Sequence, residues 1–367
     1  MAAISPGKLW SLRRLADRHG RFSLLALDRC DAATELVVAR RAQLLRDPRL
    51  APRAEDDLAR LERLLVAELS EYASGVVLDP ETYRRAAPSL DPARGVVLAL
   101  EQAGYVDEPG GRRTLLCRGW SAQEARRLGA DAVKLRLWYR ADASADVLAD
   151  QHALVEQVSQ EAREHGLAFL LEPMLYALGG AGGGDVPSAG VGDDVCDDPA
   201  LRPALTLAAI EQFRSERYAV DLFMLEAPLP PAVIPDPDAG DQASAEAQRW
   251  FDRMNALVES PWAAVSVGTT SAEQMRRILA YACRSGASGY LAGSAVWWPA
   301  AQEFPDWERL RWRLRQESSP ALSRAGSILG EYGVGWPETP RHAGAVEIAL
   351  RPPRPAEPLA PARTSGR

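Results

Sequence analysis

The stretch Ala132–Trp138, AVKLRLW, is the segment that says most about the fold of this chain. Its apolar residues alternate with Lys134 and Arg136, so on a β-strand both cations lie on one face and the apolar side chains on the other. The apolar face can pack against helices. The two cations must therefore point into a different environment, such as the interior of a barrel.

Lys134 is unusual because the chain uses arginine for almost every cation. Of 43 basic residues, only Lys8 and Lys134 are lysines. The pKa of a lysine falls readily on burial, and a neutral amine can attack a carbonyl carbon, which a guanidinium cannot do. Lys134 is thus a candidate reactive amine, with a purely structural lysine as the alternative.

Short apolar runs like this one recur along the chain and alternate with longer stretches of helical periodicity. This alternation is typical of parallel strands joined by helical crossovers, and eight strands favour a closed (β/α)8 barrel over an open doubly wound sheet. After the third run only a short helix fits. The predicted strands are Phe22–Asp28, Gly75–Asp79, Gly95–Glu101, Ala132–Trp138, Ala168–Pro173, Val220–Glu226, Ala263–Val267 and Gly289–Gly293, and the predicted helices are Ala54–Tyr72, Ser121–Leu128, Ala145–His165, Leu201–Arg217, Ala245–Glu259 and Ser271–Ser285.

Residues 1–345 are predicted to form a single barrel domain. Two segments have the composition of flexible loops: the glycine-rich, acidic segment 179–198 and the proline- and aspartate-rich segment 229–243. The proline-rich segment 346–367 is predicted to be a disordered tail.

Composition narrows the range of partners. The net charge of -7 and the pI near 5.4 give no reason to expect nucleic acid or an anionic membrane as a partner. Four scattered cysteines without CxxC spacing argue against a disulfide framework and a structural zinc site. The chain shows neither a leader pattern nor a long apolar run, so we expect a cytoplasmic protein with a small-molecule substrate, no cofactor and no metal, and we leave a homo-oligomer open.

Polar residues cluster where the predicted strands end, which is where the active site of a (β/α)8 barrel lies. Any one of them could instead cap a helix. Carboxyl groups around Lys134 would suit imine chemistry, because they can move protons to and from the carbinolamine and the substrate hydroxyl. The strand-end residues are Asp28, Asp79, Glu101, Glu172, Glu226, Ser266 and Ser294, together with Lys134 and Arg136.

Two segments after the last two strands could form a phosphate cradle of backbone N–H groups. They are 267–271, which contains Gly268, and 293–295, which begins with Gly293 and Ser294. A plain tight turn followed by a helix cap is the alternative, because no basic residue accompanies either segment.

Motifs in this order resemble the tagatose 1,6-bisphosphate aldolase family of class I aldolases, which has relatives that cleave sulfofructose phosphate. The resemblance covers roughly residues 6–300 and implies a (β/α)8 barrel with aldol chemistry through a lysine imine. The motifs that carry it are LALD at 25–28, GVVLDP at 75–80, GADAVK at 129–134, FLLEP at 169–173, VDLFMLEAP at 220–228 and GSAVW at 293–297.

The resemblance implies roles for single residues, and here the chain departs from the family. Asp28, Lys134 and Glu172 match its strand-one aspartate, strand-four lysine and strand-five general acid/base. Met224 stands where the family has its imine-forming lysine, and Ser294 where it has a phosphate-binding arginine. The family's Gln-Arg-Gly after the strand-one aspartate is Arg-Cys-Asp here, at 29–31.

Three functions remain open at this point. The first is a divergent lyase that makes or cleaves a C–C bond of a small carbonyl or sugar-like substrate, with Lys134 forming the imine, Glu172 as acid/base and Asp28 assisting. Arg136 would then bind a carboxylate or a single phosphate. The second is another barrel enzyme that uses Lys134 as an acid/base or a divalent metal on the strand-end carboxylates. The third is a non-catalytic homologue that binds a metabolite or a partner.

Overall fold

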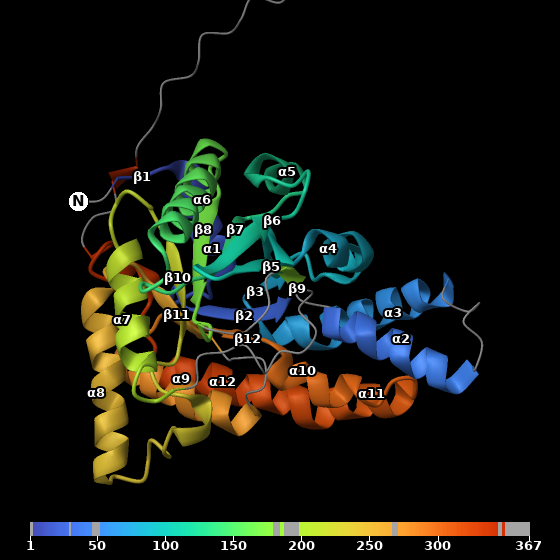
Figure 1. Cartoon of the computed structure of the whole chain (residues 1–367). Helices are drawn as coiled ribbons and strands as arrows, with labels where there is room; N and C mark the ends of the chain where they lie inside the picture. Colours follow the sequence, from blue (N-terminus) through green and yellow to red (C-terminus); the bar gives the residue numbers. More distant parts are fainter. Residues whose placement is uncertain are drawn as a thin grey trace, which may run out of the picture.

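Eight parallel strands form a closed barrel in the computed structural model of the chain, which describes residues 3–28, 31–45, 52–178, 184–186, 198–265, 271–343 and 347–348. The barrel closes where the last of these strands pairs with the first (Figure 1). The (β/α)8 prediction is confirmed, and each predicted strand overlaps a barrel strand. In order these are β2 (Phe22–Leu27), β3 (Gly75–Leu78), β4 (Gly95–Ala99), β7 (Ala132–Trp138), β8 (Ala168–Met174), β10 (Leu222–Glu226), β11 (Trp262–Val265) and β12 (Gly289–Ala292).

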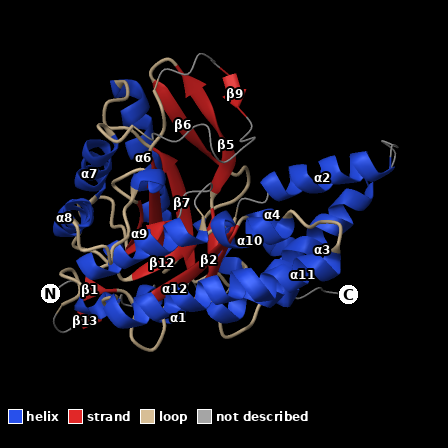
Figure 2. Ribbon diagram, turned by 90° about the horizontal axis from the view of Figure 1, so that it is seen from below, coloured by secondary structure: helices blue, strands red, loops and turns tan. Residues whose placement is uncertain are grey.

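Helices surround the barrel, and α2, α3 and α11 extend to one side of it (Figures 1 and 2). Ser271 and Gln274 form a reciprocal capping box at the start of α9, and Gly286 ends the same helix in the left-handed conformation. The α-helices are α1 (Pro6–Leu15), α2 (Asp31–Leu45), α3 (Pro52–Leu69), α4 (Pro80–Ala86), α5 (Ala122–Arg127), α6 (Ala145–Glu164), α7 (Arg202–Phe213), α8 (Gln242–Leu257), α9 (Ala272–Ser285), α10 (Ser294–Ala301), α11 (Trp307–Arg313) and α12 (Ser319–Tyr332). Shorter helical turns are η2 (Ser70–Tyr72), η3 (Ala87–Ser89), η4 (Pro231–Val233), η5 (Leu314–Ser318) and η6 (Trp336–Glu338).

The barrel strands separate two apolar layers. Val133 and Leu135 of β7 belong to the large cluster between the strands and the helices. Ala132, on the other face of β7, belongs to a smaller cluster inside the barrel, together with Leu170 and Met224. Lys134 and Arg136 share the face of Ala132 and therefore point inward, as the alternation predicts.

An antiparallel hairpin interrupts the barrel pattern after β4. It consists of β5 (Glu101–Glu108) and β6 (Gly111–Leu116), and β9 (Gly184–Val186) pairs with β5. The sequence pattern left room for only a short helix in this region, and that helix, α5, follows the hairpin.

Aromatic packing fastens the hairpin to the barrel. The guanidinium carbon of Arg112 lies 4.0 Å from the ring centre of Tyr105, 5.2 Å from that of Trp138 and 4.9 Å from that of Tyr176. The backbone N–H of Trp138 also donates to Thr114 Oγ1 at 2.9 Å. The hairpin is therefore packed against β7 and the end of β8, close to the strands that carry the polar residues.

The described ends of the chain lie side by side. β1 (Ala3–Ile4) pairs in parallel with β13 (Glu347–Ile348), which lies within the predicted tail; the rest of 346–367 is outside the described residues. Most of the predicted loop 179–198 is also outside them. The segment 229–243 is described, and Arg276 and Arg284 contact its aspartates, while its flexibility stays a prediction. None of the described helices is long and apolar enough to span a membrane.

Candidate active site

Three carboxylates surround the amine of Lys134. Lys134 Nζ lies 2.7 Å from Asp28 Oδ2, 2.7 Å from Glu101 Oε1 and 2.7 Å from Glu172 Oε2. Arg136 joins the group through Nη2, 3.0 Å from Glu172 Oε1 and 4.0 Å from Asp28 Oδ2. We call these five residues the Lys134 cluster. Lys134 is fully buried, and no other member is more than 8% exposed.

The barrel register brings the cluster together. Lys134 pairs with Ala99 at the end of β4, and Glu101 follows two residues later on the same chain. On the next strand Arg136 pairs with Glu172, so their side chains lie side by side inside the barrel. Asp28 directly follows β2. All the acidic members thus stand near the carboxyl end of a strand, where barrel active sites are built.

The electrostatics favour a charged Lys134. Burial and the neighbouring Arg136 act to lower the pKa of Lys134, but the three carboxylates outweigh them and raise it above its usual value. Burial likewise acts to raise the pKa of Glu172, but Arg136 and Lys134 hold that pKa below its usual range. The cluster therefore contains an ammonium, a guanidinium and the ionised carboxylate of Glu172 at neutral pH. In this state Lys134 is not a nucleophile.

The three carboxylates could hold a cation. One oxygen from each of Asp28, Glu101 and Glu172 lies within 4.8 Å of the others, a spacing compatible with a shared metal ion. The ammonium of Lys134 contacts all three carboxylates, so these side chains form an ion-pair network around it.

Glu101 Oε2 and Arg136 Nε of the cluster are buried, and neither has a hydrogen-bond partner among the described residues. Buried polar atoms are normally satisfied, and those that are not often mark a functional site. One atom is an acceptor and the other a donor, so together they could contact a hydroxyl and a carbonyl oxygen of a ligand.

Two other predicted site residues have partners within the protein. Asp79 caps α4 by accepting from Glu81 N and Thr82 N, each at 2.9 Å, and burial raises its pKa to about 6. Glu226 accepts from Leu175 N at 2.9 Å and from Arg202 at 3.2 Å. Neither carboxyl contacts Lys134. Asp79 and Glu226 are predicted from the sequence to help bind the substrate, and this role stays a prediction.

Met224 is completely buried inside the barrel. The β8–β10 pairing runs through Leu222–Leu170 and Phe223–Leu171, so Met224 follows beside Glu172. Gly293 and Ser294 stand at the start of α10. Ser266 and Gly268 lie outside the described residues.

Two contributors were missed among the predicted site residues. From the sequence Glu101 is one of several strand-end carboxyls, and its position at the end of Gly95–Glu101 is the signal that could place it beside Lys134. Arg202, which pairs with Glu226, comes from α7, and nothing in the sequence separates it from the other arginines.

The comparisons with known proteins agree with this architecture. A family model described as DeoC/LacD family aldolase matches residues 41–298, well over half of the chain. The chain belongs to this aldolase family. Tagatose 1,6-diphosphate aldolase from Streptococcus pneumoniae serotype 4 is 30% identical over 343 residues, covering 92% of this chain and 99% of the relative. Tagatose 1,6-diphosphate aldolase 1 from Streptococcus mutans serotype c is 28% identical over 340 residues, with coverages of 89% and 97%.

Solved structures of aldolases share the fold of this family member. Fructose-bisphosphate aldolase from Plasmodium falciparum, solved in a ternary complex, has a TM-score of 0.61 at 14% identity and covers 90% of this chain and 97% of its own. Fructose-bisphosphate aldolase from Slackia heliotrinireducens has a TM-score of 0.54 at 14% identity, with coverages of 89% and 90%. At such low identity the likeness shows the barrel fold alone. Family membership supports an aldolase-type lyase.

Proposed function

We propose that the protein is a divergent aldolase-type lyase that makes or cleaves a C–C bond of a small carbonyl or sugar-like substrate, with Lys134 as the charged centre of its site. The observation that carries this proposal is the contact of Lys134 Nζ with three carboxylates at 2.7 Å, beside the buried Met224. A thioether cannot form an imine. The chemistry must therefore be carried by the Lys134 cluster.

In this proposal Lys134 acts as an ammonium rather than as an amine. In the cleavage direction, a carboxylate such as Glu172 takes the proton of the substrate hydroxyl, and that oxygen becomes the carbonyl oxygen of the first product. The C–C bond breaks, and its electron pair moves toward the original carbonyl, whose oxygen becomes an enolate. Lys134 and Arg136 stabilise this negative oxygen. The proton held by the carboxyl then returns to the enolate carbon.

Imine formation by Lys134 is the alternative mechanism. It requires the ammonium to lose a proton first, and each unit by which its pKa exceeds the pH costs about 1.4 kcal/mol. Three carboxylates at hydrogen-bond distance oppose that loss. The contacts of Lys134 therefore support the ammonium mechanism over the imine mechanism.

A substrate phosphate would be weakly held in the proposed site. Ser294 offers a hydroxyl where the resemblance places an arginine, and a hydroxyl cannot make a bidentate charged contact. Arg136, the guanidinium inside the barrel, is already bound to Glu172. We therefore favour a non-phosphorylated substrate, or one whose anionic group is a carboxylate, over a sugar bisphosphate.

A non-catalytic homologue is the second candidate, and one observation favours it. All five members of the Lys134 cluster are buried and paired with oppositely charged neighbours. Such a network can hold a barrel together without turnover. The protein would then bind a metabolite or a partner.

The experiment assays purified protein with a panel of hydroxyketones and sugar acids, with tagatose 1,6-bisphosphate as the phosphorylated member. We expect aldehyde release from a non-phosphorylated substrate and poor binding of the bisphosphate. Lys134→Arg should remove most of the activity, because a guanidinium remains charged but cannot reproduce the three-way contact of an ammonium. Lys8→Arg, which changes the other buried lysine, is the matched control and should retain it.

Borohydride trapping separates the mechanisms. The chain has only two lysines, so mass spectrometry of a reduced adduct assigns the modified amine directly. A trapped adduct on Lys134 would replace the ammonium mechanism with the imine mechanism. Calorimetric binding of a panel member without turnover would favour the non-catalytic homologue.

A further inference from the structure

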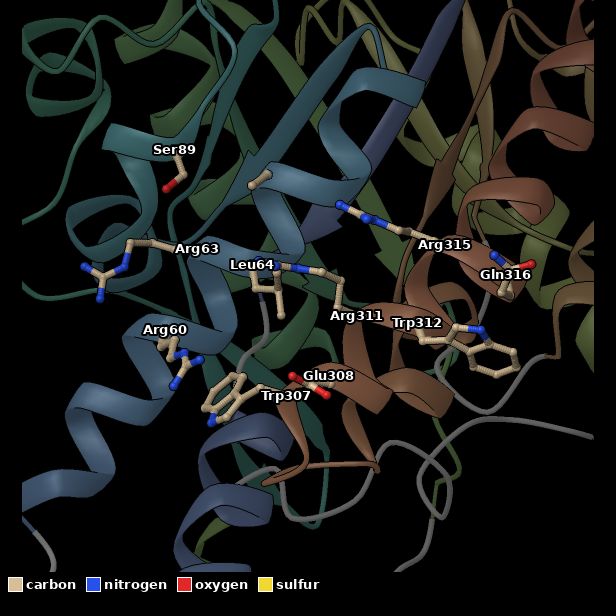
Figure 3. A pocket seen from close by; sticks show the side chains of 11 residues that line it. Arg60, Arg63, Leu64, Ser89, Trp307, Glu308, Arg311, Trp312, Arg315 and Gln316 are labelled. Atoms are coloured by element: carbon tan, nitrogen blue, oxygen red, sulfur yellow. The ribbon is translucent and has the colours of Figure 1, made fainter.

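A charged groove lies on the outside of the barrel, between α3 and the α11–η5 segment. Its volume is about 790 Å³, within the range of pockets that hold small molecules. Its lining includes four arginines and two tryptophans, Arg60, Arg63, Arg311, Arg315, Trp307 and Trp312, and one acidic residue, Glu308 (Figure 3). We call it the Arg–Trp groove. None of these residues belongs to the Lys134 cluster.

The four arginines of the groove are not equivalent. Arg311 and Arg315 both pair with Glu68, at 3.0 and 2.7 Å. Arg60 instead lies over the ring of Trp307, with its guanidinium carbon 4.1 Å from the ring centre. In the described part of the chain neither Arg60 nor Arg63 has an ion-pair partner. Stacking on the indole orients Arg60 and leaves the edge of its guanidinium available for hydrogen bonds.

Trp312 adds an aromatic surface to the same groove. It is 58% exposed, which is unusual for an indole, and it makes no ring contact with another aromatic residue of the described chain. An exposed indole in the same groove as Arg60 and Arg63 can stack on a planar ring while these cations bind an anion. The positive groove also stands out on a protein whose net charge is -7.

We propose that the Arg–Trp groove binds a nucleoside polyphosphate. Arg60 and Arg63 bind the phosphates, and Trp312 stacks on the base. A groove with only cations would suit any polyanion, but the combination of a planar aromatic surface, free guanidiniums and a volume of small-molecule size matches a nucleotide more closely than an acidic peptide.

The groove is separate from the proposed active site, because no member of the Lys134 cluster comes from α3 or α11. Glu62, which precedes Arg63, is 1% exposed and lies on the buried side of the helix. There it contacts Arg85 and Thr82, and Thr82 in turn contacts Asp79. Substitutions of exposed groove residues can therefore be made without touching the Lys134 cluster.

Isothermal titration calorimetry of the full chain with ATP, inorganic tripolyphosphate and adenosine tests the proposal. We expect ATP to bind with micromolar affinity that falls as salt is added. Arg63→Ala should weaken ATP and tripolyphosphate at least tenfold. Trp312→Leu should weaken ATP but leave tripolyphosphate unchanged, because only ATP carries a ring.

Arg253→Ala is the matched control. Arg253 is an exposed arginine of α8 that lies over Trp250 at 4.6 Å, outside the groove, and its loss should leave ATP affinity unchanged. The proposal is overturned if ATP does not bind at millimolar concentration, if Arg63→Ala binds ATP as well as the wild type, or if an acidic peptide binds the groove in place of ATP.

Discussion

Replacing Lys134 by methionine tests the charge balance of the Lys134 cluster. Methionine keeps much of the length but removes the one group that contacts Asp28, Glu101 and Glu172 together. With all carboxyls ionised, the net charge of the cluster changes from minus one to minus two. Removing one partner of a buried ion pair costs about 3–5 kcal/mol. We expect a loss of this size in the free energy of unfolding near neutral pH.

The loss in the free energy of unfolding of Lys134→Met should grow as the pH rises. Without the ammonium, burial and mutual repulsion raise the carboxyl pKa values, so the folded variant retains a proton that the unfolded chain releases. One retained proton lowers the stability by about 1.4 kcal/mol per pH unit, from the unfolded carboxyl pKa near 4 up to the raised folded value.

In the wild type, the stability contributed by Glu172 changes with pH in the opposite direction. The pKa of Glu172 is held below its usual value, so the stability that this carboxylate contributes is present above its unfolded pKa and is lost as the pH falls. The pKa of Lys134 is raised, so the stability that its ammonium contributes is present at neutral pH and is lost only as the pH rises through the folded value. The two curves should therefore converge in acid and separate toward neutral pH.

Urea denaturation followed by tryptophan fluorescence at several pH values measures both effects. Lys134→Arg keeps the charge and should lose much less stability. Lys8→Met is the matched control, because Lys8 has a single carboxylate partner, Asp221, at 2.5 Å. Phe169 N continues to donate to that carboxylate, so Asp221 keeps one of its partners and Lys8→Met should cost less stability than Lys134→Met. A loss below about 1 kcal/mol for Lys134→Met, or one independent of pH, would refute the charge-balance argument.

Two further predictions concern neighbouring positions. Met224→Lys places an amine inside the barrel beside Glu172 and near Lys134, and the positive charge of Lys134 lowers the pKa of the new amine. The variant should gain adducts with dihydroxyacetone that borohydride traps. A folded variant without such adducts would show that the pocket no longer accepts that substrate. Asp79→Asn should stabilise the fold at pH 7.5 but not at pH 4, because the Asp79 carboxyl, with its pKa of about 6, destabilises the folded state only once it ionises. The free energy of unfolding at pH 7.5 should rise by about 1–2 kcal/mol, a gain reduced by the loss of a charge that favours the helix N-terminus. Melting temperatures that rise equally at both pH values would contradict this origin.

The barrel could be predicted from the sequence because its strands carry a strong local signal. Runs such as Gly75–Leu78 and Ala132–Trp138 are apolar, short and bounded by helical patterns, so their ends were placed to within a few residues. The inward direction of Lys134 follows from alternation along a single strand. Neither inference depends on how distant segments meet.

The hairpin was missed although it has a signal of its own. Pro109, Gly110 and Gly111 form a turn motif between two segments of extended character, which is typical of a β-hairpin. The strand–helix alternation that predicts the rest of the barrel does not predict this antiparallel hairpin.

The charge state of Lys134 could not be predicted from the sequence, because it depends on the simultaneous approach of three carboxylates. Alternation places the lysine inside the barrel, but it does not say whether its nearest neighbours raise or lower its pKa. Glu101 enters the cluster only because the chain continues past β4. The Arg–Trp groove likewise requires α3 and α11 to lie together, although they are more than 200 residues apart in the sequence.

The pairing of β1 with β13 gives the molecule a defined response to mechanical force. The two strands are parallel and only two residues long, with Ala3 opposite Glu347 and Ile4 opposite Ile348. Tension applied to the two ends of the chain pulls the strands in opposite directions along their length, so their hydrogen bonds are loaded together in shear. The pairing of β1 with β13 bears the applied force before any barrel strand does. The site inside the barrel is therefore not strained until this pairing breaks.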